Sequence, residues 1–239
     1  DEVIVPAISF VSTATAGSRV GATPVFVDIE PYSFNLDPER VRAAVSRRTK
    51  AVLAVHFGGP QAEIEALEAI TREHGLLLLE DAAHAQGSEW NGRRAGSFGT
   101  TQDEPLAAAM RSFANCGRRA GENFFNHYEL GTNFRMTAFQ AAVLLAQLER
   151  LPDQIDLRTR NAARIRREVD LPGLTWQRVP PQVNRHSQYL LLGRIDAARL
   201  GRTRDEFHRT LSAAGVPATP FYPHTLYQNP LYQRGGCRV

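Results

Sequence analysis

Two acids and a histidine follow the most apolar segment of the chain. Residues 76–79 are four consecutive leucines; Glu80 and Asp81 come directly after them, and His84 follows three residues beyond Asp81. An apolar run without alternation is typical of a strand that is buried on both faces, as in parallel sheets. A carboxylate that is removed from water at the end of such a strand needs a partner that compensates its charge. The segment therefore predicts a ligand site that begins at Asp81.

The spacing of Asp81 and His84 indicates which ligand would fit. A helix is expected directly after Asp81, which places this carboxylate at the carboxyl edge of the sheet, where open α/β folds bind ligands. Residues three apart share a helix face, so His84 would point into the same crevice. An acid and an imidazole there suit a heteroaromatic cofactor with a ring nitrogen and a phenolic oxygen. The alternative is that Asp81 only caps the helix, which leaves His84 unexplained.

Strand and helix patterns alternate along the first half of the chain. Turn and capping residues mark the ends of the helices, such as Asp37 before Pro38 and Gly75 after the third helical pattern. The alternation predicts a parallel, doubly wound α/β sheet. Strands are expected at residues 1–6, 24–29, 50–57 and 76–79, and helices at 10–20, 37–45 and 61–74.

The second half of the chain is expected to leave this sheet. Asn91 and Gly92 are a strong hairpin signal. A long helix is predicted over 137–169, with a kink near Pro152. We expect a large domain over 1–150 and part of a small α+β domain over 151–239. Further helices are predicted at 105–116 and 203–214 and a strand at 188–195, and the long helix should pack on the sheet through Phe139, Val143, Ala146 and Leu148.

Composition excludes several classes of function. The 239 residues are 43% hydrophobic and 22% charged, with a net charge of +3. The basic residues are scattered, which argues against nucleic-acid binding, and no apolar run is long enough to span a membrane. No signal peptide is visible, and two cysteines fit a reducing cytoplasm.

The sequence contains no motif for a metal or a nucleotide. The seven histidines are dispersed, so no metal site is predicted, and no glycine-rich dinucleotide or phosphate loop is present. A phosphate could still bind at the helix start over 9–13, although Ser and Thr there are also ordinary caps.

Six segments, in the same order along the chain, resemble the DegT/DnrJ/EryC1/StrS aminotransferases. These are pyridoxal-phosphate enzymes of the aspartate-aminotransferase fold (fold type I) that aminate keto-sugars and keto-cyclitols. Residues 111–119 and 147–154 are most similar to the glutamine:scyllo-inosose aminotransferase and 3-amino-5-hydroxybenzoate synthase branches. The six segments are 1–6 (Asp-Glu-Val-Ile-Val-Pro), 21–28 (Gly-Ala-Thr-Pro-Val-Phe-Val-Asp), 48–52 (Arg-Thr-Lys-Ala-Val), 55–56 (Val-His), 80–87 (Glu-Asp-Ala-Ala-His-Ala-Gln-Gly) and 133–142 (Asn-Phe-Arg-Met-Thr-Ala-Phe-Gln-Ala-Ala).

The resemblance implies a role for five residues. Asp81 would pair with the protonated pyridine nitrogen of pyridoxal 5'-phosphate, and His84 would hydrogen-bond its phenolic oxygen. Phe10 would cover the face of the ring, unless it is an ordinary core residue. Asn133 would reach the cofactor phosphate of a second subunit, so that a homodimer shares its active sites. His224 lies in a region that often approaches the substrate, although a structural role is equally compatible with it.

The sequence departs from the family at the catalytic lysine, which forms the Schiff base with the cofactor. Residues 96–100 match the family just before that lysine segment and 101–106 match just after it, but the intervening stretch of about 20 residues, enough for a strand and a loop, is not there. Lys50 is the only lysine, and it matches a remote strand start. We expect the catalytic lysine in a segment between Thr100 and Thr101 of a longer enzyme, which would also have a βα unit before Asp1 and further strands after Val239.

The leading hypothesis is therefore transfer of an amino group from glutamine or glutamate to a keto-sugar or keto-cyclitol. Two alternatives remain open. One is a sugar 3-dehydratase of the same family, in which histidine replaces the lysine. The other is a catalytically inactive subunit that pairs with an active relative, which is what the absence of the lysine favours.

Overall fold

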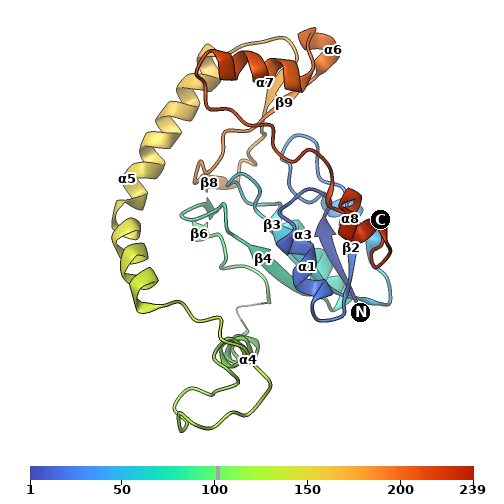
Figure 1. Cartoon of the computed structure of the whole chain (residues 1–239), viewed down its shortest axis with the longest axis vertical. Helices are drawn as coiled ribbons and strands as arrows, with labels where there is room; N and C mark the ends of the chain where they lie inside the picture. The colour runs from blue at the N-terminus through green and yellow to red at the C-terminus, as the bar shows by residue number, and fades with distance from the viewer. Residues whose placement is uncertain (101–102) are drawn as a thin grey trace.

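A parallel sheet of four strands forms the centre of the molecule (Figure 1). The computed structural model describes residues 1–100 and 103–239. The order in the sheet is β2-β1-β3-β4, and every neighbouring pair is parallel. The strands therefore end at a common edge, as the alternating pattern predicted. They are β1 (Glu2–Pro6), β2 (Thr23–Val27), β3 (Thr49–Val55) and β4 (Leu77–Asp81).

Helices cover both faces of this sheet, so the doubly wound prediction is confirmed. α1 (Ser12–Ser18) contributes Ala14 to one apolar cluster, while α2 (Pro38–Ala44) and α3 (Ile64–His74) contribute to the other. The Asp37 side chain accepts hydrogen bonds from the first amides of α2, and Gly75 ends α3 with a left-handed φ of 64°. Both termini follow the predicted capping chemistry.

The expectation that residues 76–79 are buried on both faces is wrong. Leu78 is 1% exposed and packs with α3, but Leu77 is 40% exposed. The reason is that β4 is the edge strand of the sheet, since among residues 1–100 and 103–239 it pairs with a strand, β3, on one side only. An edge strand leaves one row of its backbone groups and part of one face without cover.

The helix expected directly after Asp81 is also absent from the structure. Residues 82–88 instead form two successive turns, with hydrogen bonds from the Ala85 amide to the Ala82 carbonyl and from the Ser88 amide to the Ala85 carbonyl. Ala85 and Ser88 are fully buried, and Gly87 has a φ of 79°. The chain therefore enters the core at this point, which is incompatible with a continuing helix.

The predicted hairpin at Asn91 and Gly92 is confirmed. It joins β5 (Glu89–Trp90) to β6 (Arg93–Arg94), and both turn residues have positive φ, 49° and 78°. Such turns match the twist of the paired strands. β8 (Val183–Arg185) adds to the other side of β5.

α4 (Glu104–Ala114) and α5 (Ala138–Glu168) form where helices were expected, and α5 runs through Pro152. The prediction that the start of α5 packs on the sheet is wrong: Phe139 is 80% exposed, and Val143, Ala146 and Leu148 are exposed too. Figure 1 shows why, because α5 arcs around the molecule and its first half stands away from β4. The buried residues of α5 are Ile155 and Ala162, both beyond residue 150.

The last third of the chain folds as short strands and helices and then returns to the sheet. The strand expected over 188–195 is limited to its last three residues, whereas the helix predicted over 203–214 forms with Thr203 in a capping box. The Leu226 amide donates to the Ala7 carbonyl, and Tyr232 packs edge-on against Phe26. Within residues 1–100 and 103–239, no helix is both long and apolar enough to cross a membrane. The elements are β7 (Leu174–Trp176), β9 (Gly193–Ile195), α6 (Ala197–Leu200), α7 (Arg204–Ala213), the 3-10 helix η2 (Leu226–Gln228) and α8 (Pro230–Gln233).

Candidate functional site

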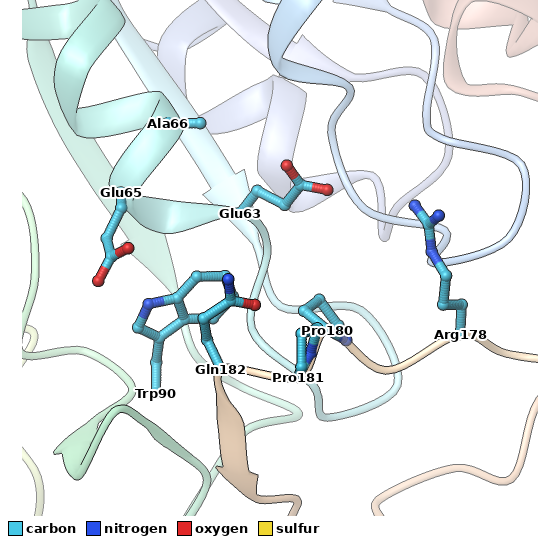
Figure 2. A pocket seen from close by; sticks show the side chains of 8 residues that line it. All are labelled: Glu63, Glu65, Ala66, Trp90, Arg178, Pro180, Pro181 and Gln182. Atoms are coloured by element: carbon cyan, nitrogen blue, oxygen red, sulfur yellow. The ribbon is translucent and has the colours of Figure 1, made fainter.

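Two pockets of the described residues lie away from Asp81 and His84. One, of about 370 Å³, is formed where Trp90 meets the start of α3 and the segment 178–182 (Figure 2). The other, of about 640 Å³, lies over the start of α5 between Phe134 and Leu144. Neither lining includes Asp81 or His84. The chemistry of the side chains, rather than the depth of a cavity, therefore locates the candidate site.

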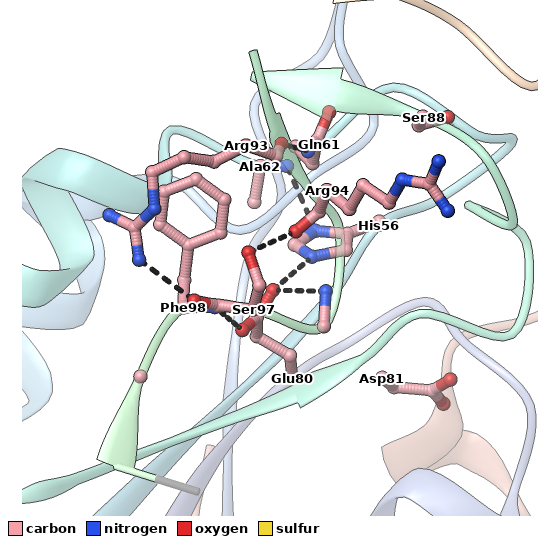
Figure 3. Close-up of polar contacts among 12 residues, drawn as sticks. His56, Gln61, Ala62, Glu80, Asp81, Ser88, Arg93, Arg94, Ser97 and Phe98 are labelled. Carbon is pink, nitrogen blue, oxygen red and sulfur yellow. Dashed lines mark hydrogen bonds and ion pairs between the residues drawn. The ribbon is translucent and has the colours of Figure 1, made fainter. Parts of the chain in front are cut away.

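Asp81 ends β4 at the carboxyl edge of the sheet, as predicted. Its carbonyl oxygen accepts a hydrogen bond from the His56 amide (3.1 Å), which fastens it to the end of β3. Oδ1 of its carboxylate accepts from the Ala83 amide (3.0 Å). Figure 3 shows the carboxylate pointing away from the polar cluster around Glu80, on the opposite face of the strand. In the described part of the chain the carboxylate has no ion-pair partner, so it is available to a cationic group of a ligand.

His84 is held by the end of β3 as well. Its Nδ1 accepts a hydrogen bond from the Gly58 amide (3.2 Å), which assigns the ring proton to Nε2 in the neutral imidazole. Burial lowers the pKa of His84, and the nearby Asp81 carboxylate opposes that shift. The imidazole is therefore neutral at pH 7, and its Nε2–H is a donor beside the Asp81 carboxylate.

Aromatic residues from distant segments surround His84. Tyr189 stacks on the imidazole, with ring centroids 4.3 Å apart, and Phe57 lies 5.7 Å from it. Tyr222 packs against Phe57, and its pKa is raised by burial and then by the negative charge of Asp81. Sequence reasoning missed Phe57, Tyr189 and Tyr222, because no local pattern links residues so far apart.

The loop that carries Tyr189 is fixed against the strand ends. The Ser187 hydroxyl donates to the carbonyl of His84 (2.7 Å), and the Ser187 amide donates to the Ser88 hydroxyl (2.8 Å). A Cβ on Gly59, whose φ is 124°, would collide with the Ser187 hydroxyl. Gly59 is therefore needed for the close approach that brings Tyr189 onto His84.

The three other predicted residues lie at different places. Phe10 follows β1 at the same edge of the sheet as Asp81 and is 63% exposed. His224 is exposed, two residues after Tyr222. Asn133 lies beyond α4, in a segment that Figure 1 shows apart from the sheet, and its side chain accepts from Arg135 Nε (3.0 Å). The structure thus brings Asp81 and His84 together, and the roles of all five residues stay predictions.

Comparison with known proteins gives a consistent result. The model of the DegT/DnrJ/EryC1/StrS aminotransferase family matches residues 1–102 and, separately, 99–237. The two matches overlap at residues 99–102, around the point next to Thr100 where the sequence departs from the family pattern. Thr101, on the other side of that point, lies outside the described residues.

Individual relatives agree with the family match. A pleiotropic regulatory protein of Geobacillus stearothermophilus is 33% identical over 260 residues, which cover 100% of this chain and 68% of the relative. A putative L-glutamine:3-amino-2,3-dideoxy-scyllo-inosose aminotransferase of Streptomyces kanamyceticus is 34% identical, covering 93% of this chain and 60% of the relative. The crystal structure of a 3-amino-5-hydroxybenzoic acid synthase superposes with a TM-score of 0.89 at 32% identity, covering 99% of this chain and 67% of that one.

The relatives are longer than this chain. The chain spans between 60% and 68% of the length of these three proteins. The first match extends over 260 residues although this chain has 239. That relative therefore has residues, within the matched region, that this chain lacks.

Proposed function

Because the chain belongs to the DegT/DnrJ/EryC1/StrS aminotransferase family, we propose that it carries the pyridoxal-phosphate site of an aminotransferase that acts on a keto-sugar or keto-cyclitol. The amino donor would be glutamine or glutamate. The observation that carries this proposal is that the Asp81 carboxylate, which has no ion-pair partner among the described residues, and the neutral His84 imidazole lie together at the carboxyl edge of the sheet. The glutamine-dependent scyllo-inosose relative supports the choice of donor and acceptor.

The two side chains suit the two polar groups of a pyridoxal ring. The Asp81 carboxylate has an oxygen without a hydrogen-bond partner among the described residues, and it can accept from a protonated ring nitrogen. His84 offers an Nε2–H, which can donate to a phenolic oxygen. Phe10, exposed at the same edge, is available to cover the ring face. When bound, the cofactor supplies an electron sink for the carbanion that forms at the amino-acid Cα.

The chain's own residues would tune that sink. The negative charge of Asp81 would hold a proton on the ring nitrogen, because an ion pair is worth more in a partly buried site than in water. Neutral His84 would donate to the phenolic oxygen without adding a second positive charge. The low pKa of His84 ensures that this donor does not change its charge near pH 7.

A homodimer is the proposed assembly. Phe134, Phe139 and Leu144 are 65%, 80% and 46% exposed, and all three line the 640 Å³ pocket. Exposed apolar surface of this kind is typical of a protein interface. Asn133 is in the same segment, which fits a side chain that reaches the partner's cofactor phosphate. Cys116 and Cys237 are both free thiols, which fits a cytoplasmic enzyme.

The lysine remains the critical difference between this chain and an active transferase. Lys50 is exposed at the start of β3, whereas Asp81 lies at the opposite, carboxyl edge of the sheet. Lys50 is therefore too far from the proposed site to move protons there. We propose that the family's lysine belongs to a segment between Thr100 and Thr101 of a longer protein, at the point where the two family matches overlap. A natural protein of 26.5 kDa by intact mass would contradict this and would favour the inactive partner subunit; a histidine at that place would favour the dehydratase.

Cofactor binding can be tested without the lysine. Pyridoxamine 5'-phosphate carries the ring nitrogen and the phenolic oxygen and needs no covalent bond, so its fluorescence on titration reports the site. Asp81→Asn should weaken its binding at least about tenfold, because one charge-assisted hydrogen bond is lost. Asp28→Asn is the matched control, since Asp28 directly follows β2 but pairs with Arg40 on the surface. Equal affinity of the wild-type protein and Asp81→Asn would contradict the proposed site.

A further inference from the structure

Glu80, the residue before Asp81, is a buried carboxylate without a cationic side chain to neutralise it. Its side chain is 2% exposed, and its one ion-pair contact in the described part of the chain is with His56. Oε2 accepts from His56 Nε2 (2.9 Å) and from the Gly96 amide (2.9 Å), while Oε1 accepts from the Phe98 amide (2.6 Å). Figure 3 shows these contacts converging on the carboxylate. Three N–H donors therefore satisfy its two oxygens.

His56 is the common anchor of the two neighbouring acids. Its Nδ1 accepts from the Ala62 amide (3.2 Å), so the proton is on Nε2 and is donated to Glu80. The backbone amide of the same residue donates to the carbonyl of Asp81 (3.1 Å). The His56 side chain is completely buried, which leaves it little freedom. The end of β4 is thus fixed by one residue through both its backbone and its side chain.

The direction of Asp81 depends on this attachment. Consecutive side chains of a strand point to opposite faces, so a rotation that releases Glu80 also turns Asp81. In the described part of the chain β4 has a strand neighbour only on its β3 side, and its outer side meets the segment 96–100 through the Leu78 amide, which donates to the Thr100 hydroxyl. The Glu80 carboxylate holds that segment in place through Gly96 and Phe98. The Glu80 carboxylate therefore restrains the end of β4 on its outer side, where no strand is hydrogen-bonded to β4 in the described part of the chain.

We propose that Glu80 is a positioning residue for Asp81: by binding His56 and the amides of Gly96 and Phe98, it fixes the direction in which Asp81 presents its carboxylate to the cofactor ring. The functional part of this inference rests on the proposed role of Asp81. The same contacts fasten the segment 96–100, which leads to the point where the family's lysine segment is expected. Glu80 would thereby fix the positions of Asp81 and of the segment 96–100 relative to each other.

Glu80→Gln tests the proposal while keeping the shape of the side chain. The amide nitrogen of glutamine would face N–H donors, so at least one of the three hydrogen bonds is lost. Amide hydrogen exchange should become about tenfold faster at Gly96 and Phe98, and also at Ala83, whose amide reports on the Asp81 carboxylate. Pyridoxamine 5'-phosphate should bind about tenfold more weakly. In the Asp81→Asn background the same change should have little further effect, because Glu80 acts through Asp81.

Glu68→Gln is the matched control. The Glu68 carboxylate also accepts from the segment 96–100, through the Gly99 amide (3.4 Å), but it lies on α3 and does not adjoin Asp81. It should leave Ala83 exchange and cofactor affinity unchanged. If Glu80→Gln fails to fold, His56→Asn keeps an acceptor for the Ala62 amide and removes only the Nε2 donor, and it should show the same pattern to a smaller extent.

The outcomes separate this proposal from the proposed function. If Gly96 and Phe98 exchange faster while Ala83 is unchanged, Glu80 only fastens the loop, and the positioning role is wrong. A loss of affinity that is equally large with Asn at position 81 would overturn it too. If the wild-type protein does not bind pyridoxamine 5'-phosphate, the proposed function fails, but exchange at Ala83 still decides whether Glu80 orients Asp81.

Discussion

Two regions of the molecule differ in which side chains they bury. In the strand-end cluster (residues 56–59, 80–88, 96–99 and 186–189), polar groups are buried and bonded to one another, as in the pair formed by His56 and Glu80. In the α4–α5 arm (residues 104–151), apolar side chains are exposed: Phe125 is 81% and Leu130 95% exposed. The strand-end cluster satisfies the hydrogen bonds of its polar groups within the chain, whereas the α4–α5 arm leaves apolar surface exposed to solvent.

The difference indicates where the chain can fold without additional contacts. A buried carboxylate is tolerated only where its donors are already in place, so the strand-end cluster must form as a unit. The arm has few buried residues to define its position, and its apolar surface gains stability only when another surface covers it. Mutations should therefore be costly in the cluster and nearly silent in the isolated arm.

The largest effect is expected for an alanine at a glycine of the cluster. Gly99 has a φ of 71°, and a Cβ there would lie 2.5 Å from the backbone oxygen of Leu78. Gly99→Ala should lower the free energy of unfolding by about 4 kcal/mol, from left-handed strain and a clash with a backbone that cannot yield. Gly121 in the arm has a similar φ of 80° but nothing within 4 Å, so Gly121→Ala should cost only about 1 kcal/mol. Urea unfolding of both variants would reveal the difference, and equal losses would contradict the comparison.

The sequence predicted the elements better than it predicted their surroundings. Local signals such as Asp37, Gly75 and the Asn91–Gly92 pair were sufficient, because caps and tight turns depend on adjacent residues. Burial was mispredicted for Leu77 and Phe139, because it depends on which neighbours are present rather than on the residue itself.

The candidate site divides in the same way. Asp81 and His84 were found because they are close together in sequence and follow an apolar strand. The helix proposed between them was wrong, but the turn brings the two residues together all the same, since the end of β3 holds both. Tyr189 and Tyr222 come from segments more than 100 residues downstream. Only the tertiary fold places them near His84.

The next effect concerns pH and tests how tightly the cluster is closed. His186 packs against Gly59, and burial followed by the charge of Arg166 lowers its pKa from 6.5 to about 4. Between these two values the unfolded chain binds a proton that the folded chain does not, so stability falls as the pH falls from about 6.5 to 4. This group alone accounts for at most about 3 kcal/mol.

His186→Asn should remove that part of the pH dependence. Asparagine can still accept from the Gln188 amide, as Nδ1 of His186 does, but it does not titrate. As the pH falls from 6.5 to 4, the wild-type protein should lose up to about 3 kcal/mol of unfolding free energy that the variant does not lose, so the difference between the two proteins should change with pH. His224→Asn, at an exposed position, should leave the pH profile unchanged. A wild-type profile that is parallel to that of His186→Asn would show that the cluster admits water.

The smallest effect on stability is expected in the α4–α5 arm, where one substitution should affect association much more than unfolding. Phe139 is 80% exposed, so Phe139→Gln should change the free energy of unfolding of the monomer by less than about 0.5 kcal/mol. If the arm is the interface of the proposed homodimer, the same change should raise the dimer dissociation constant at least about tenfold in sedimentation equilibrium, because a large aromatic side chain is lost from an interface. Arg164→Gln, on the exposed surface of the same helix and paired with Glu168, should leave association unchanged. A Phe139→Gln variant that loses more than about 1 kcal/mol as a monomer would show instead that the start of α5 packs against its own chain, and the contrast between the two regions would disappear.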